Sequence, residues 1–192
     1  MSNAYCLGHS LCIELLKYRK ETIIKAFFHT KIIKNDNYLK LIKDLEKNKI
    51  PYEFNDYLFK KESKKENCYV IFEFKRYECE SDFEEFLFIE DEFSEQDLGT
   101  IIRTMVAFDF KNIYLAKKID LFSKALIRSS VGALFQANIK FIDKQKIENE
   151  LVYQSLNNYK LSDKMALKLD DKISKINQIG IILYDLYIKK HP

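Results

Sequence analysis

The sequence predicts an α/β fold in two parts, a small α/β module followed by a domain with a parallel sheet. Segments with helical periodicity alternate with short β-rich runs along the chain, a pattern typical of α/β proteins. The charge also changes along the chain. Residues 1–80 carry 16 Lys and Arg against 12 Asp and Glu, residues 81–111 carry 2 against 9, and residues 112–192 carry 14 against 8. We therefore place the domain boundary at the start of the acidic stretch, giving domains of residues 1–80 and 81–192.

The first domain is expected to form an αβαβ module over residues 5–78. Its helices are predicted from the spacing of apolar residues, and its strands from runs of β-branched and aromatic residues. We expect a helix at 9–19, a strand at 22–30, a helix at 37–50 that ends before Pro51, and a strand at 68–74. Residues 59–67, which read FKKESKKEN, are expected to form an exposed loop.

The second domain alternates more regularly between strand and helix. We expect strands at residues 85–91, 112–116 and 139–142, a helix that begins near Gly99, and a second helix at 121–135. Alternation of this kind predicts a parallel sheet with right-handed crossovers. Ligands bind such sheets beyond the carboxyl ends of the strands. The functional rim should therefore contain residues 91–99 and 116–123.

Composition narrows the class of protein. Hydrophobic residues make up 47% of the chain, including 15 Phe and 12 Tyr, which predicts an ordered globular protein. No apolar run approaches the roughly 20 residues of a membrane span, so we expect no contact with a membrane. The four cysteines form no CxxC pair and have no His at metal spacing, which predicts reduced thiols, no metal site and a cytoplasmic location.

Gly99 and Arg103 are the strongest candidates for a functional site. A glycine where a loop turns into a helix allows close approach of a phosphate or of a neighbouring loop, and the free N–H groups of a helix start favour an anion. Arg103 lies one turn later, on the same face of the predicted helix. Its permanent charge calls for a phosphate or a carboxylate. A pairing with Asp91 or Glu92 across the loop is the alternative to a ligand.

Four lysines in the predicted loop are candidates for contacts with RNA phosphates. They are Lys60, Lys61, Lys64 and Lys65. A solvated loop with no partner is the alternative interpretation of the same residues. A hydrolytic triad is improbable, because the three histidines are scattered along the chain. Nucleotide binding through a phosphate-binding glycine loop is also not indicated, because the sequence contains no such motif.

Three segments together resemble the SpoU/TrmH family of RNA 2′-O-ribose methyltransferases. They are DLGTIIRTMVAFDFKNIYL at 97–115, KALIRSSVGALF at 124–135 and GIILYDLY at 180–187. Three of the four glycines, Gly99, Gly132 and Gly180, fall on glycine positions of the family. The N-terminal YCLGHSLCIELL is similar to the start of the family's substrate-binding domain. The resemblance therefore extends over most of the chain.

The resemblance implies a trefoil-knotted fold, a homodimer, an RNA substrate and S-adenosylmethionine held by the C-terminal loops. Arg103 corresponds to the family's catalytic arginine, which is expected to engage the RNA backbone or to help activate the ribose hydroxyl. Ser130 and Gly132 fall in the second motif, which is largely architectural. Arg128 in the same motif could contact RNA or could cap the end of its helix.

The sequence departs from the family at several positions. Asp97 replaces an Asn of the first motif, and no glycine occurs between Gly132 and Gly180, where the family has its glycine-rich cofactor loop. The positions that correspond to cofactor-binding residues are Leu161, Ser162, Ile173 and Ser174. The segment between the motifs is also shorter than in the family, so the knot could be reduced or lost.

Two functional hypotheses follow. The first is an active, divergent RNA 2′-O-ribose methyltransferase, acting on ribosomal or transfer RNA with S-adenosylmethionine and Arg103. The second is a shortened relative that has lost the cofactor and acts as an RNA-binding or dimeric interaction protein. A third interpretation, in which the glycine matches are coincidental, predicts an unrelated α/β domain.

Overall fold

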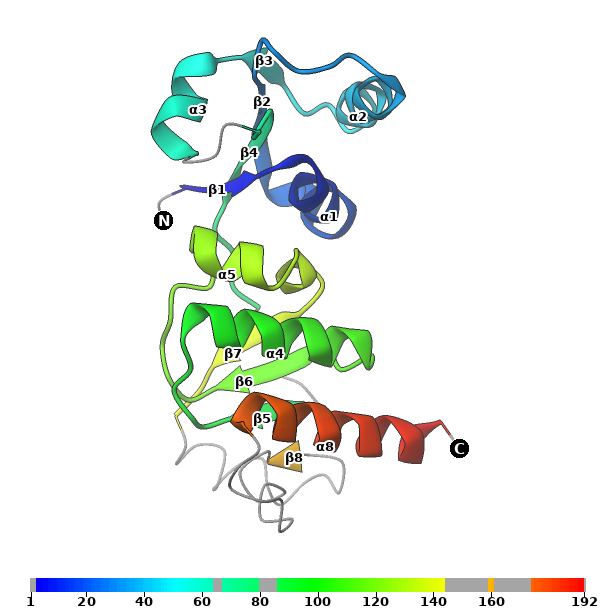
Figure 1. Cartoon of the computed structure of the whole chain (residues 1–192), viewed down its shortest axis with the longest axis vertical. Helices are drawn as coiled ribbons and strands as arrows, with labels where there is room; N and C mark the ends of the chain where they lie inside the picture. The colour runs from blue at the N-terminus through cyan, green and yellow to red at the C-terminus, as the bar shows by residue number, and fades with distance from the viewer. Residues whose placement is uncertain (1–2, 64–66, 80–85, 144–158, 161–173, 192) are drawn as a thin grey trace.

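The computed structural model describes residues 3–63, 67–79, 86–143, 159–160 and 174–191. Two four-stranded sheets follow one another along the long axis of the molecule (Figure 1). The α/β fold class and the parallel sheet of the second part are confirmed. No helix of the described ranges is both long enough and apolar enough to cross a membrane.

The first sheet has the strand order β1-β4-β2-β3. β4 pairs antiparallel with both of its neighbours, and β2 pairs parallel with β3. The elements in chain order are β1 (Asn3–Leu7), α1 (His9–Arg19), the 3-10 turn η1 (Lys20–Thr22), β2 (Ile23–Phe28), α2 (Asp36–Lys47), β3 (Tyr52–Phe54), α3 (Asp56–Glu62) and β4 (Val70–Lys75). α1 and α2 pack on one face of this sheet, whereas Phe59 of α3 packs on the other.

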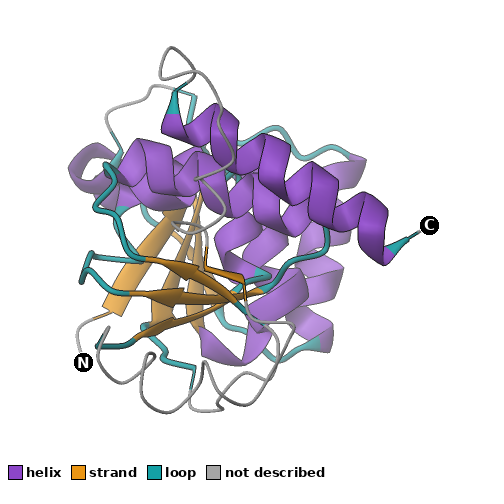
Figure 2. Ribbon diagram, turned by 90° about the horizontal axis from the view of Figure 1, so that it is seen from below, coloured by secondary structure: helices purple, strands orange, loops and turns teal. Residues whose placement is uncertain are grey.

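The second sheet has the order β7-β6-β5-β8, and all of its pairings are parallel. Its elements are β5 (Leu87–Ile89), α4 (Glu95–Ala107), β6 (Asn112–Leu115), α5 (Lys124–Ser129), the 3-10 turn η2 (Ala133–Phe135), β7 (Asn138–Phe141), β8 (Tyr159–Lys160) and α8 (Lys175–Lys190). Figures 1 and 2 show α4, α5 and α8 gathered on one side of the strands. The knot expected from the resemblance would involve residues 144–158 and 161–173, which lie outside the described residues.

The two sheets share one continuous apolar core. α5 and η2 pack against β1 and α1, so they form the layer between the two halves. Phe74 of β4 is fully buried, and its ring lies 5.5 Å from the ring of Phe122 and 5.8 Å from that of Phe135. The division into residues 1–80 and 81–192 stays a prediction, because the core does not break at that point.

Several expected elements differ in the first half. The αβαβ pattern omitted β1 and β3, which are short strands of the same sheet. The loop expected at 59–67 is also wrong in its first part, because α3 extends to Glu62. The side chain of Asn55 caps this helix by accepting a hydrogen bond from the Leu58 N–H at 3.1 Å. The helix expected at 37–50 begins at Asp36 and already ends at Lys47.

Two predictions for the second half also need correction. The helix expected to begin near Gly99 begins at Glu95, so Gly99 lies inside it. The helix expected at 121–135 is broken into α5 and η2. The break occurs where Val131 and Gly132 adopt positive φ angles of 52° and 82°, which end a right-handed helix.

Candidate functional site

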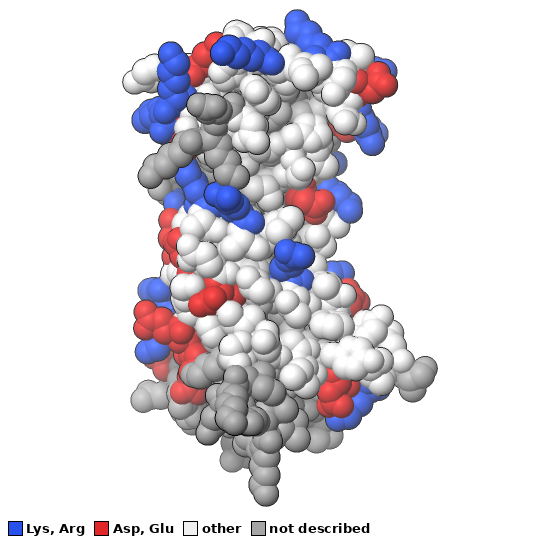
Figure 3. Space-filling view, viewed as in Figure 1, with Lys and Arg blue, Asp and Glu red and all other residues white. Residues whose placement is uncertain are grey.

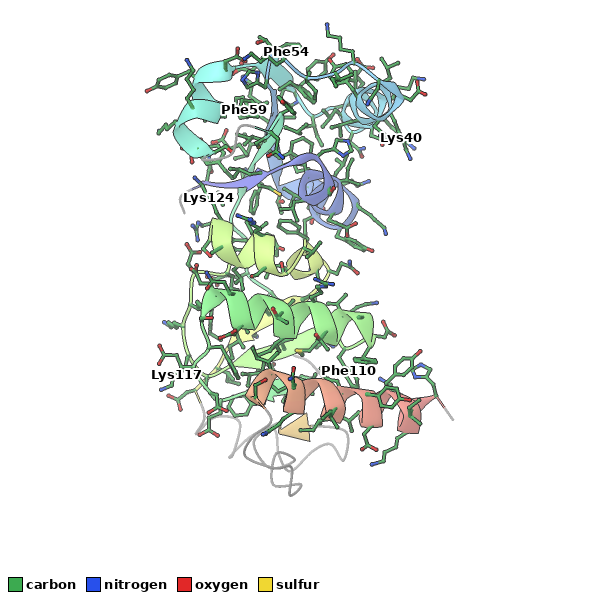
Figure 4. All side chains as sticks on the ribbon, viewed as in Figure 1. Lys40, Phe54, Phe59, Phe110, Lys117 and Lys124 are labelled. Atoms are coloured by element: carbon green, nitrogen blue, oxygen red, sulfur yellow. The ribbon has the colours of Figure 1, made fainter. Side chains whose placement is uncertain are left out.

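The carboxyl ends of β5 and β6 form a rim at one edge of the second sheet. The strands are parallel neighbours, so the segments that follow them meet, as the sequence predicts. A hollow of about 60 Å³ lies there, lined by polar residues that include Asp91, Glu92, Lys117 and Lys118. Figure 4 shows Lys117 at this edge of the molecule. The rim therefore combines carboxylates and ammonium groups around a small apolar floor.

The first turn of α4 carries its own negative charge. Ser94 caps the helix, its Oγ accepting a hydrogen bond from the Asp97 N–H at 3.1 Å. Glu95 and Asp97 occupy the first turn, where carboxylates interact favourably with the helix dipole. These carboxylates would repel a phosphate, so the predicted anion site at the start of this helix is not supported.

Gly99 has a structural role at the contact between α4 and α5. It is buried one turn inside α4, and a Cβ atom at this position would lie 1.9 Å from Ser129 Oγ and 2.8 Å from the Ser130 backbone nitrogen. The Ser129 hydroxyl donates to the Glu95 carbonyl at 3.0 Å, across the same contact. Gly99 therefore lets α5 approach α4 closely, rather than opening a loop to a ligand.

Arg103 lies on the exposed stripe of α4, together with Gln96, Thr100 and Ala107. On either side of this stripe α4 packs against α5 and α8. The predicted alternative, a pairing with Asp91 or Glu92, is not observed, and Arg103 forms no ion pair with any described residue. An exposed guanidinium without a partner is available to bind an anionic group from outside the chain.

The second motif forms the end of α5 and the turn that follows it. Ser130 is fully buried, and its hydroxyl donates to the Ile127 carbonyl at 3.0 Å. A Cβ on Gly132 would lie 2.8 Å from Glu14 Cβ of α1, so this glycine fits both the left-handed turn and the contact with the first half. Arg128 is exposed in the last turn of α5, where a cation favours the helix dipole. Its proposed contact with RNA stays a prediction.

The third motif lies on α8. Ser174 caps this helix, and its Oγ accepts a hydrogen bond from the Asn177 N–H at 3.4 Å. No described atom lies within 4 Å of a Cβ built on Gly180. The other residues predicted to bind the cofactor, Leu161, Ser162 and Ile173, lie outside the described residues.

The lysines predicted to contact RNA lie around the end of α3. Lys60 and Lys61 are exposed, whereas Lys64 and Lys65 lie outside the described residues. The ammonium group of Lys61 is 3.9 Å from the carboxylate of Glu62. Lys124, at the start of α5, reaches the same carboxylate at 2.8 Å (Figure 4). Part of the positive charge around the end of α3 is therefore already paired with a carboxylate of the same chain.

Sequence reasoning missed a cleft of about 390 Å³ between the two halves. Arg19 at the end of α1 crosses this cleft. Its Nη2 donates to the Ala137 carbonyl at 3.1 Å and to Asn138 Oδ1 at 3.0 Å, while its guanidinium lies 5.2 Å from the centre of the Tyr77 ring. Burial raises the pKa of the Tyr77 hydroxyl. Residues 118 positions apart form these contacts, so no local pattern could have indicated them.

The cysteines form no site of their own in the described part of the chain. Cys6, Cys12 and Cys68 are buried thiols of the first half, and Cys79 is half-buried. Burial raises the pKa of the Cys12 thiol well above its usual range, which makes this thiol unreactive. Within the described ranges, no cluster of three or more His, Cys, Asp or Glu side chains could hold a metal ion.

Comparison with known proteins gives structural matches only. No protein-family model and no curated protein matches this sequence. The AdoMet-bound rRNA methyltransferase from Sinorhizobium meliloti superposes with a TM-score of 0.70 at 15% identity, over 98% of this chain and 87% of its own. The SpoU methyltransferase AviRb from Streptomyces viridochromogenes superposes with a TM-score of 0.71 at 10% identity, over 98% and 90% of the two chains.

A third structure is larger than this chain. It is an RNA 2′-O ribose methyltransferase, with a TM-score of 0.60 and 16% identity over 76% of this chain. The match covers 57% of that protein and 56% of another rRNA methyltransferase from Sinorhizobium meliloti. Identities this low establish a shared fold. The chain therefore has the α/β fold of the SpoU methyltransferases, the family that its sequence resembles, while the expected knot lies outside the described residues.

Proposed function

We propose that this protein is an RNA 2′-O-ribose methyltransferase that uses S-adenosylmethionine. The observation that supports this most strongly is the match of nearly the whole chain to SpoU methyltransferase structures, two of them with bound AdoMet. Arg103, at the position of the family's catalytic arginine, is exposed and has no partner among the described residues. Ribosomal or transfer RNA is the proposed substrate class.

The rim at β5 and β6 suits part of the cofactor. Ile89 and Leu115 provide an apolar surface of the kind that adenine rings contact, and the carboxylates of Asp91 and Glu92 suit a sulfonium cation. The hollow of about 60 Å³ is much smaller than the roughly 300–1,000 Å³ of typical small-molecule sites. The described rim therefore accounts for only one wall of such a site. When bound, S-adenosylmethionine supplies an electrophilic methyl group.

Arg103 is proposed to hold the RNA from the exposed stripe of α4. Its guanidinium can bind a backbone phosphate through two parallel hydrogen bonds, which fixes the position of the neighbouring ribose. A fixed ribose keeps the attacking 2′-oxygen in a reactive geometry, and this saves the entropy of a bimolecular encounter. The positive charge also stabilises negative charge that develops on the 2′-oxygen as its proton passes to solvent water.

A homodimer is proposed to form through α8. Ile181, Tyr184 and Ile188 lie at helical spacing on its outer face and are 46%, 57% and 46% exposed. Figure 3 shows a broad uncharged area on the face formed by α4 and α8. A second copy seated on these three residues of α8 would remove their apolar side chains from water and would lie beside Arg103. A cytoplasmic location is proposed because the cysteines are free thiols.

The first experiment is a calorimetric titration of the full-length protein with S-adenosylmethionine and, separately, with S-adenosylhomocysteine. Binding at micromolar concentrations is expected. Transfer of a tritiated methyl group to total ribosomal and transfer RNA then measures activity. No heat at millimolar cofactor, with the protein shown to be folded, would contradict the proposal and leave an RNA-binding or interaction protein.

The decisive variant is Arg103→Ala. Loss of one charge-stabilising group typically lowers kcat by about 100-fold to 1,000-fold, and cofactor affinity should stay unchanged. Lys111→Ala is the matched control, because Lys111 is an exposed cation at the opposite, amino end of β6 and pairs with Asp109 at 2.9 Å. Full activity in Arg103→Ala would remove this residue from the mechanism.

A further inference from the structure

α1 and α2 form a groove on the outer side of the first half. The two helices pack on the same face of the first sheet, and the groove between them has a volume of about 490 Å³. Its floor is apolar and includes Ile13, Leu16 and Leu41. In Figure 1 both helices are seen nearly end-on at the same side of the molecule.

Cationic side chains line both walls of this groove. Lys17 lies near the end of α1 and Lys20 begins η1, whereas Lys40 and Lys47 come from α2. All four are exposed, and Figure 4 shows Lys40 on the side of α2 that faces α1. Among the residues that the structure describes, Asp44 is the one carboxylate that lines the groove. The groove therefore has a local excess of positive charge.

The positive charge of the groove is largely uncompensated. Lys20, Lys40 and Lys47 form no ion pair with any described residue. The ammonium group of Lys17 lies 4.7 Å from the ring centre of Tyr18, and a hydrogen bond to Tyr18 raises the pKa of this lysine, so it stays charged. Four ammonium groups that face solvent across one groove attract an anionic partner.

The lysines around α3 differ in this respect. Glu62 interacts with both Lys61 and Lys124, and Lys60 contributes to the lowered pKa of Asp56 after the hydrogen bonds from Thr30. Their charge is thus partly balanced inside the chain. Among the described lysines, those of the α1–α2 groove therefore carry more uncompensated charge than those at the end of α3.

We propose that the α1–α2 groove is the surface through which this protein holds the phosphate backbone of RNA. This assignment rests on the proposed function and moves the main RNA contact away from residues 59–67. An extended polyanion fits better than a small anion, because the cations are distributed along the groove. Lys40 and Lys47 are separated by about 10 Å along the helix axis, at a rise of about 1.5 Å per residue.

The test measures binding of a fluorescein-labelled 16-nucleotide polyuridine to the full-length protein at several salt concentrations. The groove variant combines Lys17→Ala, Lys20→Ala, Lys40→Ala and Lys47→Ala. A matched control combines Lys43→Ala, Lys75→Ala, Lys111→Ala and Lys189→Ala, which removes the same charge from exposed lysines that do not line the groove. A second groove variant with Gln at all four positions provides a test if the Ala variant does not fold, as judged by circular dichroism.

The slope of log affinity against log salt reports how many phosphates are contacted. Each contact to a single strand contributes about −0.7, so the groove variants should lose roughly 2 to 3 from the magnitude of the slope, whereas the control should lose less than about 1. An unchanged slope in a folded groove variant would overturn the groove and leave the methyltransferase proposal intact. Absence of RNA binding by the wild-type protein at low salt would instead contradict the proposed function. Polyglutamate that competes as well as unlabelled polyuridine would reassign the groove to an acidic protein.

Discussion

Two helices of the second half carry a glycine at a family motif position, and the two glycines differ in what surrounds them. A Cβ on Gly99 of α4 would lie 1.9 Å from Ser129 Oγ, whereas a Cβ on Gly180 of α8 would meet no described atom within 4 Å. The described packing therefore explains the glycine in α4 but not the glycine in α8. A glycine at a motif position can thus be required by packing inside the chain, as in α4. The requirement for the glycine in α8 does not come from the described contacts.

The α4–α5 contact also determines the surroundings of Arg103. Ser129 joins the two helices through its hydrogen bond to the Glu95 carbonyl. Arg103 lies one turn beyond Gly99, at the edge of the same contact. A change that pushes α5 away from α4 should therefore affect both stability and the position of the candidate catalytic side chain.

The largest expected effect comes from Gly99→Ala. Overpacking typically costs about 1–3 kcal/mol, and occasionally more. The new methyl group would clash with a backbone nitrogen as well as with a side chain, so we expect the upper end of this range. Ala gains about 1 kcal/mol in helix propensity, which leaves a net loss of about 2 kcal/mol in the free energy of unfolding. Urea denaturation monitored by circular dichroism measures this loss.

A second substitution identifies the cause of that loss. Ser129→Gly in the Gly99→Ala background removes the two side-chain atoms nearest to the new methyl group, so the double variant should recover part of the stability lost. Ser129→Gly alone serves as the control and completes the double-mutant cycle. Gly99→Ala with wild-type stability would mean that the helices are not packed this closely, and the contrast with Gly180 would disappear.

A smaller effect of opposite sign is expected for Gly180→Ala. The methyl group meets no described atom, so the variant should gain up to about 1 kcal/mol from helix propensity. Urea denaturation at protein concentrations where sedimentation shows a monomer measures this gain. A loss of stability under those conditions would show that Gly180 is packed within the chain after all. A loss that develops only as the protein associates would indicate a second copy seated against α8.

The sequence predicted the second half better than the first. Compact β-rich runs indicated β5, β6 and β7. Such runs are typical of parallel strands, because a parallel sheet is buried on both faces. β3 was missed because its three residues are too short for periodicity to be visible. α3 was missed because its lysine-rich sequence resembles a loop, although Phe59 anchors it to the sheet.

The candidate site was predictable only where local sequence determines it. The exposure of Arg103 follows from its permanent charge. The packing partner of Gly99 could not be predicted, because Ser129 lies 30 residues later and its position depends on how two helices pack. The α1–α2 groove likewise joins Lys17 and Lys40, whose proximity is a property of the tertiary structure.

A partly exposed ion pair should contribute less to stability than the glycine packing does, and the smallest predicted effect tests this. Arg76 follows β4, and Asp120 lies in the loop before α5. Their side chains form a bidentate ion pair, in which Nη2 of Arg76 and Oδ2 of Asp120 are 3.1 Å apart. The hydrogen bond from Arg76 is the main cause that lowers the pKa of the Asp120 carboxyl. The pair is partly exposed, so its contribution to stability at pH 7 should be below about 1 kcal/mol.

The sign of the pH dependence follows from the direction of that shift. A carboxyl whose pKa is lower in the folded state stabilises the fold above its unfolded pKa of about 3.9, and this stabilisation is lost as the pH falls through the folded value. Asp120→Asn should therefore be less stable than wild type at pH 7, and the difference should vanish in acid below that window. Asp44→Asn, at a carboxylate without an ion pair among the described residues, is the control. A difference between wild type and Asp120→Asn that persists unchanged at pH 2 would mean that Asp120 contributes to stability through the packing of its side chain rather than through its charge.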